Sequence, residues 1–349
     1  MTIPILICDD SSFARKQMVR SLPDNWDVSI SFAENGEQAI AAIKAGKADI
    51  LFLDLNMPVL DGYGTLEIIS QQDLPTLTIV VSGDIQPEAF KRVKALGALD
   101  FIKKPTAKEK VKSVLTNYGI LREEDLLTSE LLKEFPVEVQ CDKLRVSQDS
   151  QLNLDPYQEI ANVAMGRAGD LLARVFDVTV QLPIPNVNIL ASSELHMMLK
   201  AADQQQGISA VCQGYIGSGI SGEALILFYD SSLNGLAKLM HYEGEINDAA
   251  EREMLVDLSN ILIGAFLKGI SDQLDVAFSQ SHPELLGLHR SVDDIINSGS
   301  RNWQEILAIE INYVIEDHDF QCDLIILITQ ASLKTLNNKI NYLLDEQIA

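Results

Sequence analysis

The chain is poor in several residue types on which common kinds of protein site depend. Its 349 residues include two tryptophans, five histidines and four cysteines. The histidines are scattered and form no obvious catalytic triad. No two cysteines stand at metal-ligand spacing, which argues against a zinc site or a disulfide framework and fits reduced thiols in a cytosolic protein. The cysteines are Cys8, Cys141, Cys212 and Cys322.

Basic residues are also scarce. The 27 Lys and Arg residues stand against 50 Asp and Glu, which gives a net charge of −23. Residues 1–115 hold 13 basic and 15 acidic residues, whereas residues 116–349 hold 14 and 35. Binding to nucleic acid needs a basic surface. We therefore expect no nucleic-acid partner and set aside a DNA-binding output.

Membrane signals are missing from the sequence. The N-terminus lacks the basic stretch and apolar core of a signal peptide. No apolar run approaches the length needed to cross a bilayer. We therefore expect a soluble, cytoplasmic protein without a membrane partner. Its length exceeds the usual size of a single core, so two domains are the default expectation.

Four short apolar runs alternate with amphipathic stretches in the N-terminal third, a pattern that predicts a parallel sheet wrapped by helices. Polar residues stand where each run ends. Because the ligand site of such a sheet lies beyond the carboxyl ends of its strands, these residues should converge. They are Asp9 and Asp10 after residues 3–8, Asp54 after residues 49–53, Ser82 after residues 77–81, and Lys104 with Pro105 after residues 99–103.

The residue types at this point indicate phosphoryl chemistry. Three clustered carboxylates repel one another, so the site calls for a hard divalent cation such as Mg²⁺. A metal, an ammonium group and a hydroxyl beside Asp54 can neutralise a phosphoryl group, which makes Asp54 a nucleophile and phosphoryl acceptor. Taken alone, Asp9 and Asp10 could equally cap a helix that begins at Ser11 or Ser12.

Residues 1–117 resemble a two-component response-regulator receiver domain of the CheY-like (βα)5 fold. The resemblance rests on these polar residues together with the segments Asp54-Leu55-Asn56-Met57-Pro58, Asp61-Gly62, Ser82-Gly83 and Lys104-Pro105. It implies phosphorylation of Asp54 by a histidine kinase, and Mg²⁺ held by Asp9, Asp10, Asp54 and the backbone carbonyl of Asn56. It also implies that Ser82 and Lys104 bind the phosphoryl group, that Phe101 is the switch aromatic, and that a phospho-dependent homodimer could form.

After a predicted connector at residues 118–150, the chain repeats itself. A polar pattern at residues 155–166 recurs 98 positions later, and the two halves cover about residues 151–245 and 249–345. We therefore predict a pseudo-two-fold α+β domain, residues 151–349, built by duplication. The first copy is Asp155, Glu159, Asn162 and Gly166, with Pro185 further on, and the second is Glu253, Asp257, Asn260 and Gly264, with Pro283.

Each polar pattern has the spacing of one helical stripe. We expect the stripe to face outward, with its glycine permitting close approach by another backbone. The opposite face should form the core, namely Ile160, Val163, Ala164, Leu171 and Val175 in the first helix. A presented Asn can orient a water in line with an acyl phosphate, and an acid near it can engage the lysine beside that phosphate.

The pattern Asp/Ser-x₃-Glu-x₂-Asn-x₂₂-Pro resembles that of the CheC/CheX/FliY chemotaxis phosphatases, and two copies are most similar to CheC. The resemblance implies that Asn162 orients water while Glu159 docks the substrate's lysine. The second copy departs from the pattern because Asp257 replaces Glu, and a side chain one methylene shorter predicts a weak or vestigial site. Asp155, Pro185, Glu253 and Pro283 are the supporting motif positions.

Two functions follow from these patterns. In the first, the C-terminal domain hydrolyses the phospho-aspartate of a CheY-like receiver. The fused receiver is then either the substrate or the regulator of activity on a separate phosphorylated receiver, and we favour regulation. In the second, phosphorylation of Asp54 gates a non-catalytic interaction module, and the asparagine stripes are docking faces only.

Overall fold

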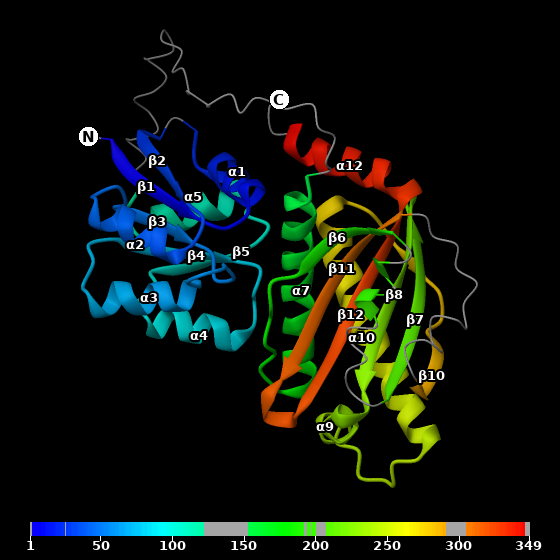
Figure 1. Cartoon of the computed structure of the whole chain (residues 1–349). Coiled ribbons are helices and arrows are strands. Elements are labelled where there is room, and N and C mark those ends of the chain that lie inside the picture. Colours follow the sequence, from blue (N-terminus) through cyan, green and yellow to red (C-terminus); the bar gives the residue numbers. More distant parts are fainter. Residues whose placement is uncertain are drawn as a thin grey trace. The chain divides into compact units, whose positions relative to one another are not determined.

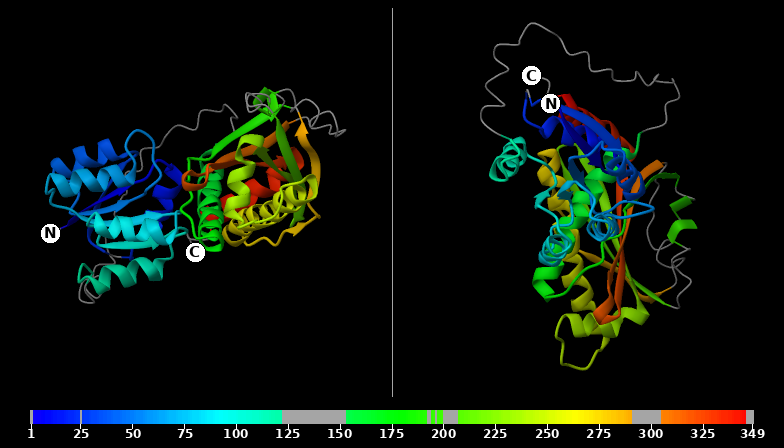
Figure 2. Two further views of the ribbon diagram at one scale, coloured as in Figure 1. Left: turned by 90° about the horizontal axis from the view of Figure 1, so that it is seen from below. Right: turned by 90° about the vertical axis from the view of Figure 1, so that its left-hand side faces the viewer.

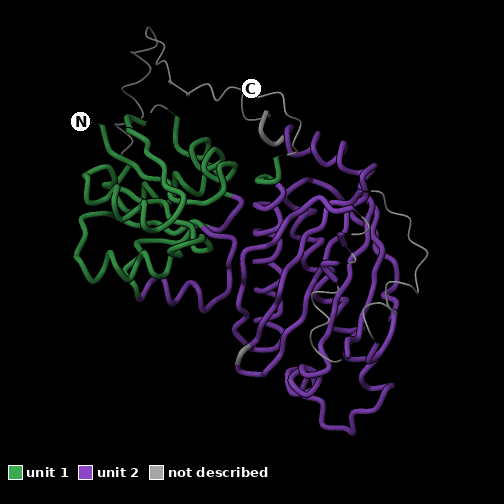
Figure 3. The backbone as a smooth tube through the Cα atoms, viewed as in Figure 1, with its two compact units in different colours: residues 1–81, 96–102, 106–156 green, residues 82–95, 103–105, 157–349 purple. Residues whose placement is uncertain are grey.

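The computed structural model describes residues 2–24, 26–121, 153–191, 194–195, 197–199, 207–290 and 305–345. The chain forms two compact units, shown in Figure 3. Unit 1 comprises residues 1–81, 96–102 and 106–156, and unit 2 comprises residues 82–95, 103–105 and 157–349. The predicted connector at residues 118–150 lies, from residue 122 onward, outside the described residues.

The N-terminal part contains a five-stranded sheet of order β2-β1-β3-β4-β5 (Figure 1). The pairs β1–β2, β1–β3 and β3–β4 are parallel. Helices alternate with the strands, so the predicted parallel sheet with helices is confirmed. The strands are β1 (Ile3–Cys8), β2 (Val28–Ala33), β3 (Ile50–Leu53), β4 (Leu77–Ser82) and β5 (Asp100–Lys103), and the helices are α1 (Ser12–Ser21), α2 (Gly36–Lys44), α3 (Gly62–Gln71), α4 (Pro87–Ala95) and α5 (Lys108–Asn117).

The core of unit 1 explains why its central strands are apolar along their whole length. All four residues of β3 are buried. Ile5 and Ile7 of β1 pack in one cluster with Met18 of α1 and with Val111 and Leu115 of α5. Strands that are covered by helices in this way need apolar side chains. The polar residues of the predicted site stand where these strands end.

Unit 2 is built on an antiparallel sheet of order β10-β7-β8-β12-β11-β6, with the short β9 paired to β7. Helices α7 and α10 lie side by side against it (Figure 2). The strands are β6 (Asn186–Ala191), β7 (Ile208–Gly217), β8 (Ile220–Tyr229), β9 (Ser279–Gln280), β10 (Glu284–Arg290), β11 (Glu305–Ile315) and β12 (Phe320–Thr329), and the helices are α7 (Asp155–Phe176), α9 (Leu233–Leu239), α10 (Asp248–Leu274) and α12 (Gln330–Asp345).

The order of elements in unit 2 has a two-fold regularity. Exchanging β6 with β10, β7 with β11 and β8 with β12 reverses the strand order onto itself. The central pair is β8 with β12, in which Phe228 is paired with Cys322 and Glu223 with Leu327. The two stretches that resemble each other in the sequence therefore run antiparallel at the centre of the sheet.

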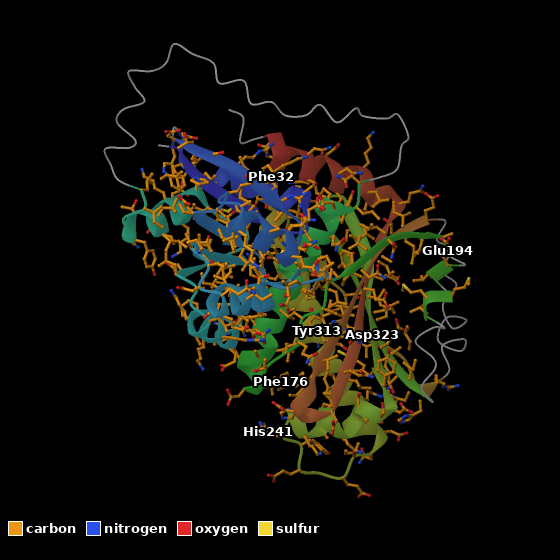
Figure 4. All side chains as sticks on the ribbon, turned by 60° about the vertical axis from the view of Figure 1, so that its left-hand side comes forward. Phe32, Phe176, Glu194, His241, Tyr313 and Asp323 are labelled. Carbon is orange, nitrogen blue, oxygen red and sulfur yellow. The ribbon has the colours of Figure 1, made fainter. Side chains whose placement is uncertain are left out.

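A buried polar group lies within this central pair. Asp323 of β12 accepts hydrogen bonds from the Tyr229 hydroxyl and, at 2.6 Å, from the Asn312 side-chain amide. Figure 4 labels Asp323 together with Tyr313, which is completely buried in β11. A buried carboxylate needs hydrogen-bond donors. Here the donors come from β8 and β11, so the hydrogen bonds link three neighbouring strands.

Helix α10 bears on the expectation that no segment of the chain crosses a membrane. Among the described residues it is the one helix long and apolar enough to cross a membrane, judged by length and composition. Its most apolar 18-residue window is 56% buried inside the fold, as a core helix of a globular domain would be.

Helix α7 matches only part of the core that the sequence predicts for it. Ile160, Val163 and Ala164 belong to the core as predicted, but Leu171 and Val175 are 39% and 51% exposed. Leu171 lines a surface cleft. The exposure of Val175 has no structural explanation.

Candidate functional site

The acidic residues of the first predicted site follow neighbouring parallel strands. Asp9 comes directly after β1 and Asp54 directly after β3, and their exposed fractions are 5% and 1%. The Asp54 backbone amide donates to the Cys8 carbonyl at 2.9 Å, which continues the β1–β3 ladder. The Asn56 amide donates to Asp54 Oδ2 at 2.8 Å. Thus Asp54 is held at the edge where the parallel strands end.

The pKa of the Cys8 thiol is raised by its surroundings. Burial is the largest cause that raises its pKa, and the negative charges of Asp9, Asp54 and Asp10 raise the pKa further. Within the described residues, no three His, Cys, Asp or Glu side chains are grouped as a ready-made metal site. The concentration of carboxylate charge nevertheless fits a hard divalent cation, for which oxygen ligands are preferred.

Two further residues of the predicted phosphate site lie in unit 2. Strand β4 ends at Ser82, strand β5 ends at Lys103, and the Lys104 amide donates to the Ser82 carbonyl at 2.9 Å. The Lys104 ammonium lies 3.0 Å from Glu159 Oε1, and the two side chains are only 5% and 4% exposed. This is the contact that the motif resemblance implies with a substrate's lysine, and here the lysine belongs to the same chain.

Asn162 follows Glu159 by one helical turn. It is 7% exposed, and among the described residues its side-chain oxygen has no hydrogen-bond partner. Buried polar atoms without a partner are uncommon and ask for a water or a ligand. The backbone of Gly83 packs against it, since a Cβ on Gly83 would lie 3.3 Å from the Asn162 carbonyl oxygen.

The first polar stripe is therefore not exposed, which corrects the expectation from the sequence. Glu159, Asn162 and Gly166 are all buried. Within unit 2, the backbone at Gly83 packs on α7 beside Asn162 and Gly166, and Lys104 pairs with Glu159. A Cβ on Gly166 would lie 2.0 Å from the Gly83 carbonyl oxygen. The close backbone approach that this glycine suggested does occur.

The second stripe, on α10, is open. Glu253, Asp257 and Asn260 are exposed, and a Cβ on Gly264 would meet no atom within 4 Å. The two motif prolines differ in the same sense: Pro185 is buried and Pro283 is partly exposed. The two copies thus share their spacing but not their surroundings.

Asp155, a supporting position of the motif, has a definite partner. Its Oδ2 accepts hydrogen bonds from the Ser12 hydroxyl at 2.6 Å and from the Phe13 amide at 2.9 Å, at the N-terminus of α1. An acidic group is favourable at this end of a helix. Phe101, the predicted switch aromatic, is buried in β5 at 7% exposure.

The sequence did not single out Gln86, although it is closely engaged. Its Nε2 donates to the Val180 carbonyl at 2.9 Å, and the Val180 amide donates to its Oε1 at 2.9 Å. One glutamine in a loop carries no pattern, so no sequence signal could have found it.

A cleft of about 590 Å³ opens beside Lys104 within unit 2. Basic groups outnumber acidic ones in its lining, so it is a local exception in a strongly acidic chain. The charged residues that line it are Lys103, Lys104, Arg167, Lys268, Asp170 and Asp272. Lys104 lines this cleft, whereas its partner Glu159 does not.

Comparison with known proteins identifies the N-terminal part of the chain. Residues 5–116 match the family model of the response regulator receiver domain. This part is therefore a receiver domain, which places the chain in two-component signalling.

Curated relatives match over about the length of that domain. The protein-glutamate methylesterase/protein-glutamine glutaminase 3 of Geobacter sulfurreducens is 37% identical over 105 residues, 30% of this chain and 28% of that protein. The protein of the same name from Bacillus subtilis is 36% identical over 106 residues, 30% of each chain. The chain thus spans about three tenths of the length of these relatives.

Solved structures also resemble parts of the chain. The FliY structure from Thermotoga maritima covers 54% of this chain and 98% of its own, at 17% identity and a TM-score of 0.43. A chain of the CheX–CheY–BeF₃–Mg²⁺ complex from Borrelia burgdorferi covers 34% of this chain and 90% of its own, at 29% identity and a TM-score of 0.32. Both are partial likenesses and carry no information on activity.

Proposed function

We propose that this chain is a chemotaxis-type signalling protein whose CheC-like second part hydrolyses the phospho-aspartate formed on Asp54 of its own receiver. The observation that carries this proposal is the buried pair of Lys104 and Glu159, one helical turn from the unpartnered side-chain oxygen of Asn162. This proposal takes the fused receiver as the substrate, whereas the sequence favoured its role as the regulator of hydrolysis on a separate receiver, and that role stays the alternative.

The residues divide the work as follows. Glu159 engages Lys104 and fixes the register of the receiver loops on α7. Asn162 holds the attacking water, since an amide oxygen accepts a hydrogen bond from it and positioning supplies most of the catalysis of phosphoryl transfer. Ser82 binds the phosphoryl oxygens together with Lys104. The cleft beside Lys104 supplies water and lets phosphate leave.

A magnesium ion fits the acidic end of the sheet. Asp9, Asp10, Asp54 and the carbonyl of Asn56 would hold it, since Asp9 and Asp54 directly follow the paired strands β1 and β3. When bound, the ion neutralises the negative charge of the aspartates and the phosphoryl group. A histidine kinase is the phosphodonor implied by a receiver domain.

The second motif has a different place in this proposal. Its stripe is exposed, so a separate phosphorylated receiver could reach it, but Asp257 is one methylene shorter than Glu159. We therefore assign it weak hydrolysis at most. Its exposure is also the observation that favours the alternative function, a phospho-gated interaction module in which the stripe only binds.

Paired substitutions separate the two functions. The full-length chain would be phosphorylated on Asp54 with a small acyl phosphate, and both the release of this phosphate and the binding of a separate phosphorylated receiver would be followed. Substituting Asn162→Ala together with Asn260→Ala should abolish the accelerated release of phosphate and largely spare binding. A chain that binds the separate receiver, and that loses its own phosphate no faster than the doubly substituted chain does, would be the interaction module.

A further inference from the structure

Gln86 makes a pair of hydrogen bonds that only a glutamine side chain can make. It is 3% exposed, and its amide both donates to and accepts from the backbone of Val180. The remaining N–H of Nε2 donates to Asp84 Oδ1 at 3.1 Å. Glutamate has no N–H to donate, and asparagine is one methylene shorter. Any apolar side chain would leave the Val180 amide and carbonyl buried without partners.

Two other positions of the receiver sequence are equally constrained. A Cβ at residue 83 would lie 3.1 Å from the Val163 Cα, so a side chain there would require the α7 backbone to shift by a few tenths of an ångström. Residue 12 must carry a hydroxyl to donate to Asp155. None of these three residues belongs to the phosphoryl chemistry, which the resemblance assigns to Asp54, Ser82 and Lys104. Features shared by all receivers cannot discriminate between them. Gly83 belongs to the segments on which the receiver resemblance rests, whereas Ser12 and Gln86 do not.

We propose that the first motif is dedicated to this chain's own receiver, with Gln86 as the principal specificity-determining residue and Ser12 as the second. This inference rests on the proposed function and names the substrate of its first site. Gln86 is a positioning residue: it touches the backbone of the loop after α7 and acts on the reaction through the placement of Ser82 and Lys104. Losing it should release the loop at residues 82–86 from the segment after α7 within unit 2 and open the first motif to other receivers.

Two assays on full-length chains test this. In the first, the chain is phosphorylated with a small acyl phosphate and hydrolysis is followed within one molecule, with Asn260→Ala present throughout. In the second, an unphosphorylatable chain carrying Asp54→Asn and Asn260→Ala acts on a phosphorylated chain carrying Asn162→Ala and Asn260→Ala. Gln86→Ala is introduced into the acting chain in each assay.

The expected effects have opposite signs. Gln86→Ala should slow hydrolysis within one molecule roughly tenfold or more, the scale of two lost buried hydrogen bonds. It should accelerate hydrolysis between molecules, because the first motif becomes accessible. Gln86→Glu, which keeps the size and loses the donor, should act the same way. Gln71→Ala, an exposed glutamine at the end of α3, is the matched control and should change neither rate.

Misfolding would lower both rates, so it cannot mimic the expected result. Unchanged rates, or rates that move in the same direction, would overturn the dedication of the first motif and leave the phosphatase standing. If neither assay shows hydrolysis that depends on Asn162, the proposed function fails and this inference fails with it. Hydrogen exchange of the Val180 amide, faster in Gln86→Ala than in Gln71→Ala, verifies that the substitution breaks the intended contact.

Discussion

The carbonyl oxygen of Gly83 occupies the space that a side chain on Gly166 would need, at 2.0 Å from the position of its Cβ. At Gly264, the equivalent position of the second stripe, no atom lies within 4 Å. Two glycines at the same place in a repeated pattern therefore have different reasons to be there.

Alanine at these two positions should act in opposite directions. Gly264→Ala should stabilise the fold by up to about 1 kcal/mol, because alanine is the better helix former. Gly166→Ala gains the same propensity but must displace the Gly83 backbone, a clash that costs about 1–3 kcal/mol. Denaturant midpoints of the two variants measured side by side give the comparison. Equal shifts would mean that Gly83 does not pack on Gly166.

The ion pair between Lys104 and Glu159 yields a second prediction. Glu159→Ala removes one partner of a buried pair and should cost about 3–5 kcal/mol in the free energy of unfolding. Asp257 is exposed, so Asp257→Ala should stay within about 0.5 kcal/mol of the parent chain. A Glu159→Ala variant as stable as Asp257→Ala would show that the ion pair is not formed in solution.

A pH-dependent contact joins β10 to its neighbours in unit 2. His289 Nδ1 lies 3.0 Å from Asp230 Oδ2, and its Nε2 lies 3.1 Å from Glu251 Oε2. The hydrogen bond to Asp230 is the largest cause that raises the pKa of His289, and burial, the second largest cause, opposes it. The charge of Glu251, a residue only 3% exposed, adds to the increase.

The sign of the pH effect follows from that direction. The pKa in the folded chain exceeds the unfolded value of about 6.5, so the stabilisation is complete below this pH and is lost as the pH rises through the folded pKa. As the pH rises from about 6.5 through the folded pKa, the parent chain should lose stability relative to His289→Gln. The His289 side chain is 45% exposed, so solvent screens the effect and keeps it small. His282→Gln, at an exposed histidine, should not change the pH profile.

The elements of the receiver could be predicted because their signals are local. The apolar runs at residues 3–8 and 77–81 correspond to β1 and β4 almost to the residue. The polar residues that end them need no knowledge of distant parts of the chain. The repeat after residue 151 comes from comparing the sequence with itself. The structure there is an antiparallel sheet with helices, and a duplicated fold stays a prediction.

The surroundings of the two stripes could not be predicted. Asn162 and Asn260 occupy equivalent positions, yet one is buried and the other exposed. What covers Asn162 is the loop at Gly83, about eighty residues earlier in the chain, and helical periodicity carries no information about such a partner. The same applies to Gln86, whose partner Val180 lies in a loop without any repeat.

The most direct test of the account is the lifetime of the phosphoryl group on Asp54 in the full-length chain, measured in a single turnover after the phosphodonor is removed. Asn162→Ala should lengthen this lifetime by a factor on the order of 10²–10³, the usual effect of losing one positioned polar group at a reacting centre. Asn260→Ala is the matched control and should leave it nearly unchanged. Equal lifetimes in the parent chain and in Asn162→Ala would contradict the central claim that this helix hydrolyses the phospho-aspartate of its own receiver.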